Sequence, residues 1–108
     1  MTPAMGWTYL VAAGFIDIAW ALSMKKADGF RNPGWSALSL ILVALFVYLL
    51  TRALAVLPVG TAYAVWTGIG AAGTAVLGMI LFGEAVTAAR VACILVIVGG
   101  TIGLQLNA

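Results

Sequence analysis

The sequence predicts an all-α, polytopic membrane protein with four transmembrane helices. Three observations lead to this prediction: 65% of the 108 residues are apolar, 7% are charged, and the charged residues bound long uncharged runs. Soluble domains are about 45–50% apolar and about 25% charged. So few polar side chains would leave large apolar patches exposed on a soluble domain. The composition therefore excludes a soluble domain, and it excludes a disordered chain as well.

The charged residues divide the chain into four segments that are each long enough to cross a membrane. A helix needs about 20 apolar residues to cross the hydrocarbon core. Four such spans fit, at about 4–24, 34–53, 59–82 and 88–106. Turn-forming residues stand at each break, namely Asp28-Gly29 and Asn32-Pro33, then Pro58, then Gly83. Because the loops are too short for a soluble domain, we expect a single four-helix domain over residues 1–108.

The first span contains the one charged residue that lies away from a loop, Asp17. A carboxylate at a helix centre costs about 2.5–3.5 kcal/mol on insertion scales, so an intramembrane acid indicates a function. The alternative is a structural acid paired with a cation inside the bundle. No other span carries a cation at its centre, because Arg52 and Arg90 lie near span ends, where they can reach the interface. Loss of hydration disfavours the charged carboxylate, so we expect Asp17 to exchange a proton for a cation.

Helical spacing surrounds Asp17 with residues that suit a cation-binding pocket. Ala13 and Gly14 are small and leave space beside the acid. Trp20, three residues on, offers an indole donor or a cation–π face. The first span is therefore expected to supply part of a substrate pocket.

The third span is expected to complete that pocket. Tyr63 and Trp66 are three residues apart and share a helix face, although an interfacial anchor is an alternative role for this pair. Gly68 and Gly70 are expected to let the helix bend. Close packing without a bend is the alternative for these two glycines.

The fourth span contains a GxxxG pair, Gly99 and Gly103. This pattern is typical of a helix-association surface, so we expect the fourth helix to hold subunits together, with packing inside the monomer as the alternative. The single cysteine, Cys93, is expected to be a small buried apolar residue.

The composition also argues against several classes of chemistry. One cysteine and no histidine leave no disulfide framework, no zinc site and no histidine-based triad. We expect no cofactor, no metal site, no catalytic residue and no enzyme activity, because a nucleophile–base pair is lacking. The five basic residues form no stripe that follows phosphates, so we expect no nucleic acid as a partner.

Charge bias predicts the orientation in the membrane. The first and third loops carry four of the five basic residues, and the opposite side carries only Arg52. Because basic loops stay in the cytoplasm, we expect both termini outside. The first apolar stretch has no basic region before it and no small-residue cleavage site, so we expect it to be retained.

Two stretches resemble the small multidrug resistance family of bacterial four-helix transporters. They are Asp17-Ile18-Ala19-Trp20-Ala21 with the following Met24-Lys25, and the run 57–70, which reads Leu-Pro-Val-Gly-Thr-Ala-Tyr-Ala-Val-Trp-Thr-Gly-Ile-Gly. The resemblance covers essentially the whole chain. Trp20 and the run 66–71 are similar to the guanidinium-exporter subtype.

The resemblance implies an antiparallel, dual-topology dimer in the bacterial inner membrane that exchanges cytoplasmic cations for protons. It implies that Asp17 is the central acid that binds proton or substrate. It further implies that the fourth helix forms the dimer contact. The remaining implied roles are binding-site aromatics at Trp20, Tyr63 and Trp66, and a bend used in alternating access at 68–70.

Three features depart from the family pattern. The family's central acid is nearly always glutamate, and Asp17 is shorter by one methylene, or about 1.5 Å of reach. Phe46 stands in the region where exporters of this subtype carry a hydroxyl, so a partner of the acid is lost. The bias of basic residues also keeps a fixed-orientation heterodimer open beside the antiparallel homodimer.

The sequence as a whole predicts a proton-coupled antiporter that exports guanidinium or small guanidinyl and quaternary ammonium cations. Its partners would be the small cation, protons and the lipid bilayer. Two alternatives remain open: a promiscuous multidrug efflux pump for aromatic cations, and a non-transporting membrane assembly subunit.

Overall fold

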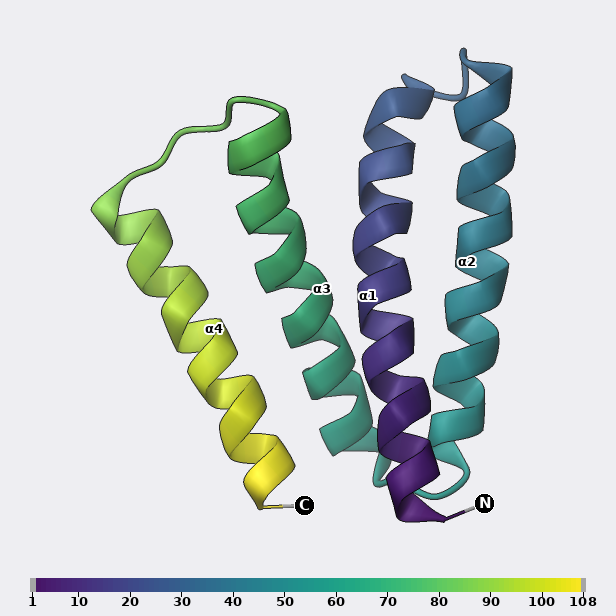
Figure 1. The fold of residues 1–108 in the computed structure, drawn as a ribbon, viewed down its shortest axis with the longest axis vertical. Coiled ribbons are helices and arrows are strands. Elements are labelled where there is room, and N and C mark those ends of the chain that lie inside the picture. The colour runs from purple at the N-terminus through teal and green to yellow at the C-terminus, as the bar shows by residue number, and fades with distance from the viewer. Residues whose placement is uncertain (1, 108) are drawn as a thin grey trace.

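The computed structural model describes residues 2–107, which form four long helices joined by short loops (Figure 1). The helices are α1 (Pro3–Ala27), α2 (Pro33–Leu54), α3 (Val59–Leu81) and α4 (Ala88–Leu106). All four are long and apolar enough to cross a membrane. The prediction of an all-α protein with four transmembrane helices is confirmed.

Local sequence explains where three of the helices begin. Thr2, Asn32 and Thr87 each precede a helix, and each side chain accepts a hydrogen bond from the backbone N–H three residues later, at 3.3, 3.3 and 3.1 Å. These contacts satisfy an N–H group that has no partner inside the helix. Pro3 and Pro33 occupy the first helical positions, where the missing proline N–H costs nothing.

The first helix continues to Ala27, past the predicted end near residue 24. Lys25 and Lys26 lie in its last turn, and positive side chains interact favourably with the partial negative charge of a helix C-terminus. The helix stops at Asp28, whose φ of 51° is left-handed, and Gly29 follows with a φ of 66°. The turn at Asp28-Gly29, rather than the charge of the two lysines, therefore ends the helix.

The helices form one flat layer in the order α2, α1, α3, α4 (Figure 1). The molecule measures 40 × 35 × 16 Å, and its thickness is little more than one helix with its side chains, about 10–12 Å. Within residues 2–107, α4 packs against α3 and against no other helix. Both chain ends lie at one end of the layer, and the loops that follow α1 and α3 lie at the other.

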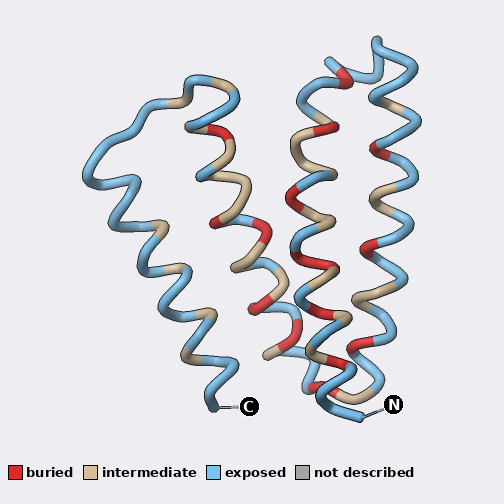
Figure 2. Tube along the Cα trace, in the orientation of Figure 1, coloured by how far each residue is buried: buried red, intermediate tan, exposed pale blue. Residues whose placement is uncertain are grey.

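The buried core lies near the chain ends, where α1, α2 and α3 meet. Its members are Leu10, Ala53, Leu57, Ala62 and Val65. Toward the opposite end α3 leans away from α1, and none of the described residues of α4 is buried (Figures 1 and 2). α1 and α2 stay packed toward that end, where Ser23, Ala27 and Ser39 are buried, so the layer opens between α1 and α3.

The exposure of α4 corrects one expectation from the sequence. Cys93 is exposed rather than buried, because α4 touches its single neighbour, α3, along one side. An apolar residue in a transmembrane helix can face lipid as well as protein, so hydropathy cannot tell the two environments apart.

Candidate functional site

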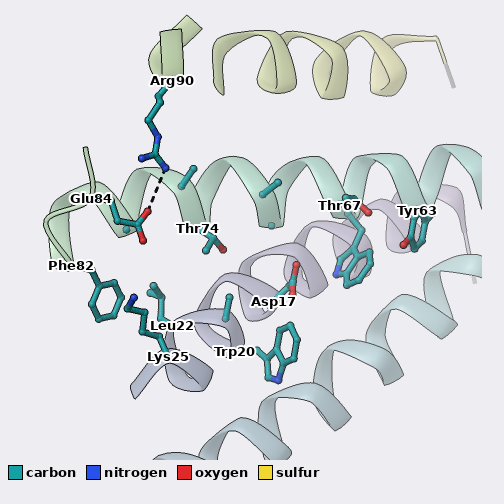
Figure 3. A pocket seen from close by; sticks show the side chains of 16 residues that line it. Asp17, Trp20, Leu22, Lys25, Tyr63, Thr67, Thr74, Phe82, Glu84 and Arg90 are labelled. Atoms are coloured by element: carbon teal, nitrogen blue, oxygen red, sulfur yellow. Dashed lines mark ion pairs between the residues drawn. The ribbon is translucent and has the colours of Figure 1, made fainter. Parts of the chain in front are cut away.

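A cleft of about 580 Å³ lies between α1 and α3 and extends to the loop between α3 and α4 (Figure 3). Five of the predicted site residues line it: Asp17, Trp20, Tyr63, Trp66 and Gly70. We call the part around Asp17, Trp20, Tyr63 and Trp66 the aromatic end. The charged end is the part around Lys25, Phe82, Glu84 and Arg90, which line the same cleft.

Asp17 occupies its place because α3 has no side chain at Gly70. A Cβ atom built on Gly70 would overlap Oδ2 of Asp17 and lie 3.0 Å from its Cγ. The carboxylate therefore lies directly against the backbone of α3. It takes part in neither of the ion pairs found within residues 2–107, so the structural ion pair considered as an alternative does not form in this chain.

Four aromatic rings from three helices form a connected row at the aromatic end. Phe46 of α2 lies between Trp20 of α1 and Trp66 of α3, with both ring-centroid distances at 5.5 Å. Tyr63 continues the row, with its ring centroid 5.5 Å from that of Trp66. Edge-to-face and tilted pairs at this distance are attractive. The row links α2 to the cleft and limits the rotation of both tryptophans.

Phe46 has a role that the sequence did not reveal. It stands where a hydroxyl was expected, and only 4% of its surface is exposed. Its ring fills the space behind the tryptophans instead of donating a hydrogen bond to the acid. The local signal was absent because the stretch 40–47 around Phe46 is wholly apolar and its positions differ only in what they face.

The indole Nε1 of Trp66 is buried and has no hydrogen-bond partner among the described residues. Leaving such a donor unsatisfied costs about 1–3 kcal/mol. Trp66 also lines the cleft that contains Asp17, so an unsatisfied donor lies close to the site.

The structure places Ala13 and Gly14 away from the cleft. Both are buried, and a Cβ on Gly14 would lie 2.8 Å from Cβ of Ile69 on α3. This differs from the expectation that they line the substrate pocket. A residue as small as Gly14 lets the backbones of α1 and α3 approach each other, and Ile69 fills the space beside it.

Gly68 and Gly70 face two different helices from one unbroken α3. A Cβ on Gly68 would overlap Oγ1 of Thr101 on α4, whereas Gly70 faces Asp17 on α1. The two glycines therefore permit close approach on opposite sides of α3. Their use as a bend in alternating access stays a prediction.

Gly99 and Gly103 have open space beside them. A Cβ on either glycine would meet no atom of the described chain within 4 Å. They are thus not needed for packing inside this chain, which leaves their surface free for a second subunit.

Several lining residues were not singled out in the sequence. Thr67, Thr74 and Gly78 share one face of α3 with Tyr63 and Gly70 and line the cleft. Their spacing of three and four residues is the signal that identifies them. The threonine hydroxyls add polar groups to the part of the cleft wall that α3 forms (Figure 3).

The charged end is organised around an ion pair that also escaped the sequence analysis. Nη2 of Arg90 lies 3.6 Å from Oε1 of Glu84 (Figure 3). The ammonium of Lys25 lies 5.5 Å from the centroid of the Phe82 ring, within the range of a cation–π contact. The two ends of the cleft thus hold one carboxylate each, the first without an ionic partner and the second with one.

The chain is similar to several known proteins along nearly its whole length. The family model described as Small Multidrug Resistance protein matches residues 5–97. A protein of Yersinia pseudotuberculosis named Guanidinium exporter is 47% identical over 102 residues, which cover 94% of this chain and 98% of the relative. Proteins with the same name from Salmonella typhimurium and Citrobacter freundii are 42% identical, over 96% and 95% of this chain and 99% and 98% of their own lengths.

Proposed function

The chain belongs to the small multidrug resistance family, and from this premise we propose that it exports guanidinium or small guanidinyl and quaternary ammonium cations in exchange for protons. It is a multi-pass protein of the bacterial inner membrane. We choose guanidinium because relatives that are similar over nearly their full length are named Guanidinium exporter. The proposed role is that of a transporter rather than an enzyme.

The observation that carries the proposal is the carboxylate of Asp17, which lies in a cleft between transmembrane helices and has no ionic partner among residues 2–107. A charged carboxylate is costly at this depth, so it is stabilised by a proton or by a bound cation. One site cannot hold both at once, and this competition couples the two flows. If the carrier switches the side to which the cleft opens only when the Asp17 carboxylate is neutralised, it exchanges the cation for a proton.

The aromatic end supplies the remaining contacts for such a cation. Guanidinium is planar and offers donors in a fork that matches a carboxylate. Its faces can stack on Trp20, Tyr63 or Trp66, all of which line the cleft. Small alkylated cations keep the charge and the aromatic contact, so they fit the same site.

We also propose that the transporter works as an antiparallel homodimer. The layer is only 16 Å thick, so a cleft in it is open to lipid until a second subunit covers it. The free Gly99 and Gly103 surface of α4 is suited to that contact. A heterodimer with a related chain is the alternative, and the mass of the purified complex decides between the two.

The decisive experiment measures proton release when guanidinium is added to the purified protein in weakly buffered detergent. We expect release from the unmodified protein and from Asp17→Glu, which keeps a carboxylate. No release is expected from Asp17→Asn. If Asp17→Asn still releases protons on adding guanidinium, the proposed role of Asp17 is wrong.

The same preparation, reconstituted in liposomes, distinguishes the alternatives. A promiscuous drug pump would transport a bulky aromatic cation at least as fast as guanidinium. A non-transporting assembly subunit would move neither cation. The proposal expects guanidinium to be transported faster.

A further inference from the structure

The ion pair at the charged end has no part in the mechanism proposed above. Glu84 and Arg90 line the same cleft as Asp17, on the side where it reaches the loop between α3 and α4 (Figure 3). A cation that enters from this side passes the pair before it reaches Asp17. The Glu84 carboxylate is therefore placed to meet the cation first.

The local chain holds the Glu84 carboxylate against the wall of the cleft. Gly83 has a φ of 65°, a left-handed conformation that turns the chain back toward α3. The backbone N–H of Glu84 donates to the carbonyl oxygen of Gly78 at 3.3 Å. A Cβ on Gly78 would lie only 2.7 Å from Oε1 of Glu84. Two glycines are thus required for this carboxylate to lie where it does.

The partner of Glu84 has the same head group as guanidinium. Arg90 presents a planar guanidinium group, and a carboxylate that accepts its donors accepts those of the free ion in the same way. The pair is also weak. Its N–O distance of 3.6 Å exceeds the 2.7–2.9 Å of a good charge-assisted hydrogen bond. The two side chains are 45% and 38% exposed, so water and ions have access to both.

We propose that Glu84 is a second cation-binding subsite, at the charged end of the cleft, and that Arg90 occupies it as a tethered competitor. Its ligands are cations of the guanidinium class. An arriving cation displaces the Arg90 head group from Glu84 and then passes to Asp17. The inference rests on the proposed function, because it assumes that the transported cation carries this head group.

The neighbouring charges explain why the carboxylate matters at this position. Lys25 lines the same end of the cleft and is held at the Phe82 ring. Without Glu84, an incoming cation meets the two positive charges of Lys25 and Arg90. Without Arg90, Glu84 is free to accept the cation. The two substitutions therefore have opposite expected effects.

Guanidinium uptake into proteoliposomes measures these effects as the concentration that gives half-maximal flux. We expect Glu84→Gln to raise this concentration about tenfold, which corresponds to the loss of one hydrogen bond to a charged group. We expect Arg90→Gln to lower it about threefold, as for loss of an exposed ion pair. The double variant is expected to lie between Glu84→Gln and the unmodified protein, because it loses the subsite but also the repulsion from Arg90. If the pair merely clamped the loop, both substitutions would change the concentration in the same direction, and the proposal would be overturned.

A matched control is available in the first loop. Asp28 and Arg31 form an exposed ion pair at 3.9 Å, and neither residue lines the cleft. Asp28→Asn removes one negative charge on the same side of the molecule. We expect no change in the half-maximal concentration. A rise equal to that of Glu84→Gln would assign the effect to general surface charge and overturn the proposal.

A binding measurement tests the subsite without transport. In Asp17→Asn protein, the Nε–H signal of Arg90 in ¹⁵N NMR, assigned by its loss in Arg90→Gln, is followed while guanidinium chloride is added. We expect a saturable shift with guanidinium and a much smaller one with tetramethylammonium chloride, which screens charge but donates no hydrogen bond. Equal shifts would mean screening alone and would overturn the subsite. This readout remains decisive if the unmodified protein fails to transport guanidinium, so the two proposals fail separately.

Discussion

The two ends of the cleft place a carboxylate in opposite circumstances. At the aromatic end Asp17 lies between two transmembrane helices, with aromatic rings beside it and no ion pair within the described chain. At the charged end Glu84 lies in a loop, partly exposed and paired with Arg90. An exposed pair of this kind contributes about 1 kcal/mol or less, so its partner exchanges easily. A carboxylate without a partner inside a membrane is costly, so it holds whatever neutralises it.

This difference suggests that the two carboxylates have different functions along one cleft. A weakly held, solvated carboxylate suits capture and release of a cation. A poorly solvated carboxylate suits strong coupling between cation and proton. Substitutions that affect one end and spare the other test whether the ends are in fact distinct.

The largest effect is expected from Gly70→Ala. The new Cβ would overlap Oδ2 of Asp17, and the side chain of Asp17 can rotate away, so the helices stay packed while the carboxylate moves. Misplacing a reacting group by about 1 Å costs about 100-fold in enzymes, and we expect a loss of similar size in guanidinium flux. Gly60→Ala on the same helix is the control, because a Cβ there meets nothing within 4 Å. Equal fluxes for the two variants would show that the position of Asp17 is unimportant.

A smaller effect is expected from Phe46→Ala at the aromatic end. Removal of a buried phenylalanine ring typically costs about 3–5 kcal/mol of stability, and both tryptophans lose their shared neighbour. We expect a lower unfolding temperature and weaker guanidinium binding, with no change in the shift of Arg90 described above. Leu40→Ala, at a position 62% exposed on the same helix, controls for loss of an apolar side chain. A change at Arg90 would show that the two ends are not independent.

The smallest effect is expected from Gly83→Ala at the charged end. The position has open space but a φ of 65°, so the cost is conformational, about 1–2 kcal/mol. We expect the Glu84 carboxylate to leave the cleft wall and the half-maximal guanidinium concentration to rise. Proton release through Asp17 is expected to persist at saturating cation. Gly100→Ala, which also has open space but lies inside α4, is the matched control.

Much of the fold is encoded in local properties of the chain. Four apolar segments separated by charges predict four spans, since burial in lipid depends on each segment's own composition. Capping side chains mark the starts of α1, α2 and α4, and prolines mark those of α1 and α2, because each acts on the backbone of its own first turn. Asp17 is identified in the same way, because a single charge inside an apolar segment needs no knowledge of its neighbours to be recognised as exceptional.

The arrangement of the site depends on contacts between segments far apart in the chain. Hydropathy does not tell which face of α1 meets α3, so Gly14 was expected in the pocket and instead packs against Ile69 of α3, while Ala13 is buried and does not line the cleft. The position of Phe46 between two tryptophans requires three helices at once.

The distinction between local properties and contacts in space also applies to the two carboxylates, Asp17 and Glu84. The intramembrane position of Asp17 follows from the sequence alone, because the cost of a charge in lipid is a property of the segment that contains it. The pairing of Glu84 with Arg90, and the place of both in the wall of the Asp17 cleft, follow only from the tertiary structure. Coulomb attraction and hydrogen bonding depend on distance in space, and only the packing of α3 against α1 and α4 sets those distances.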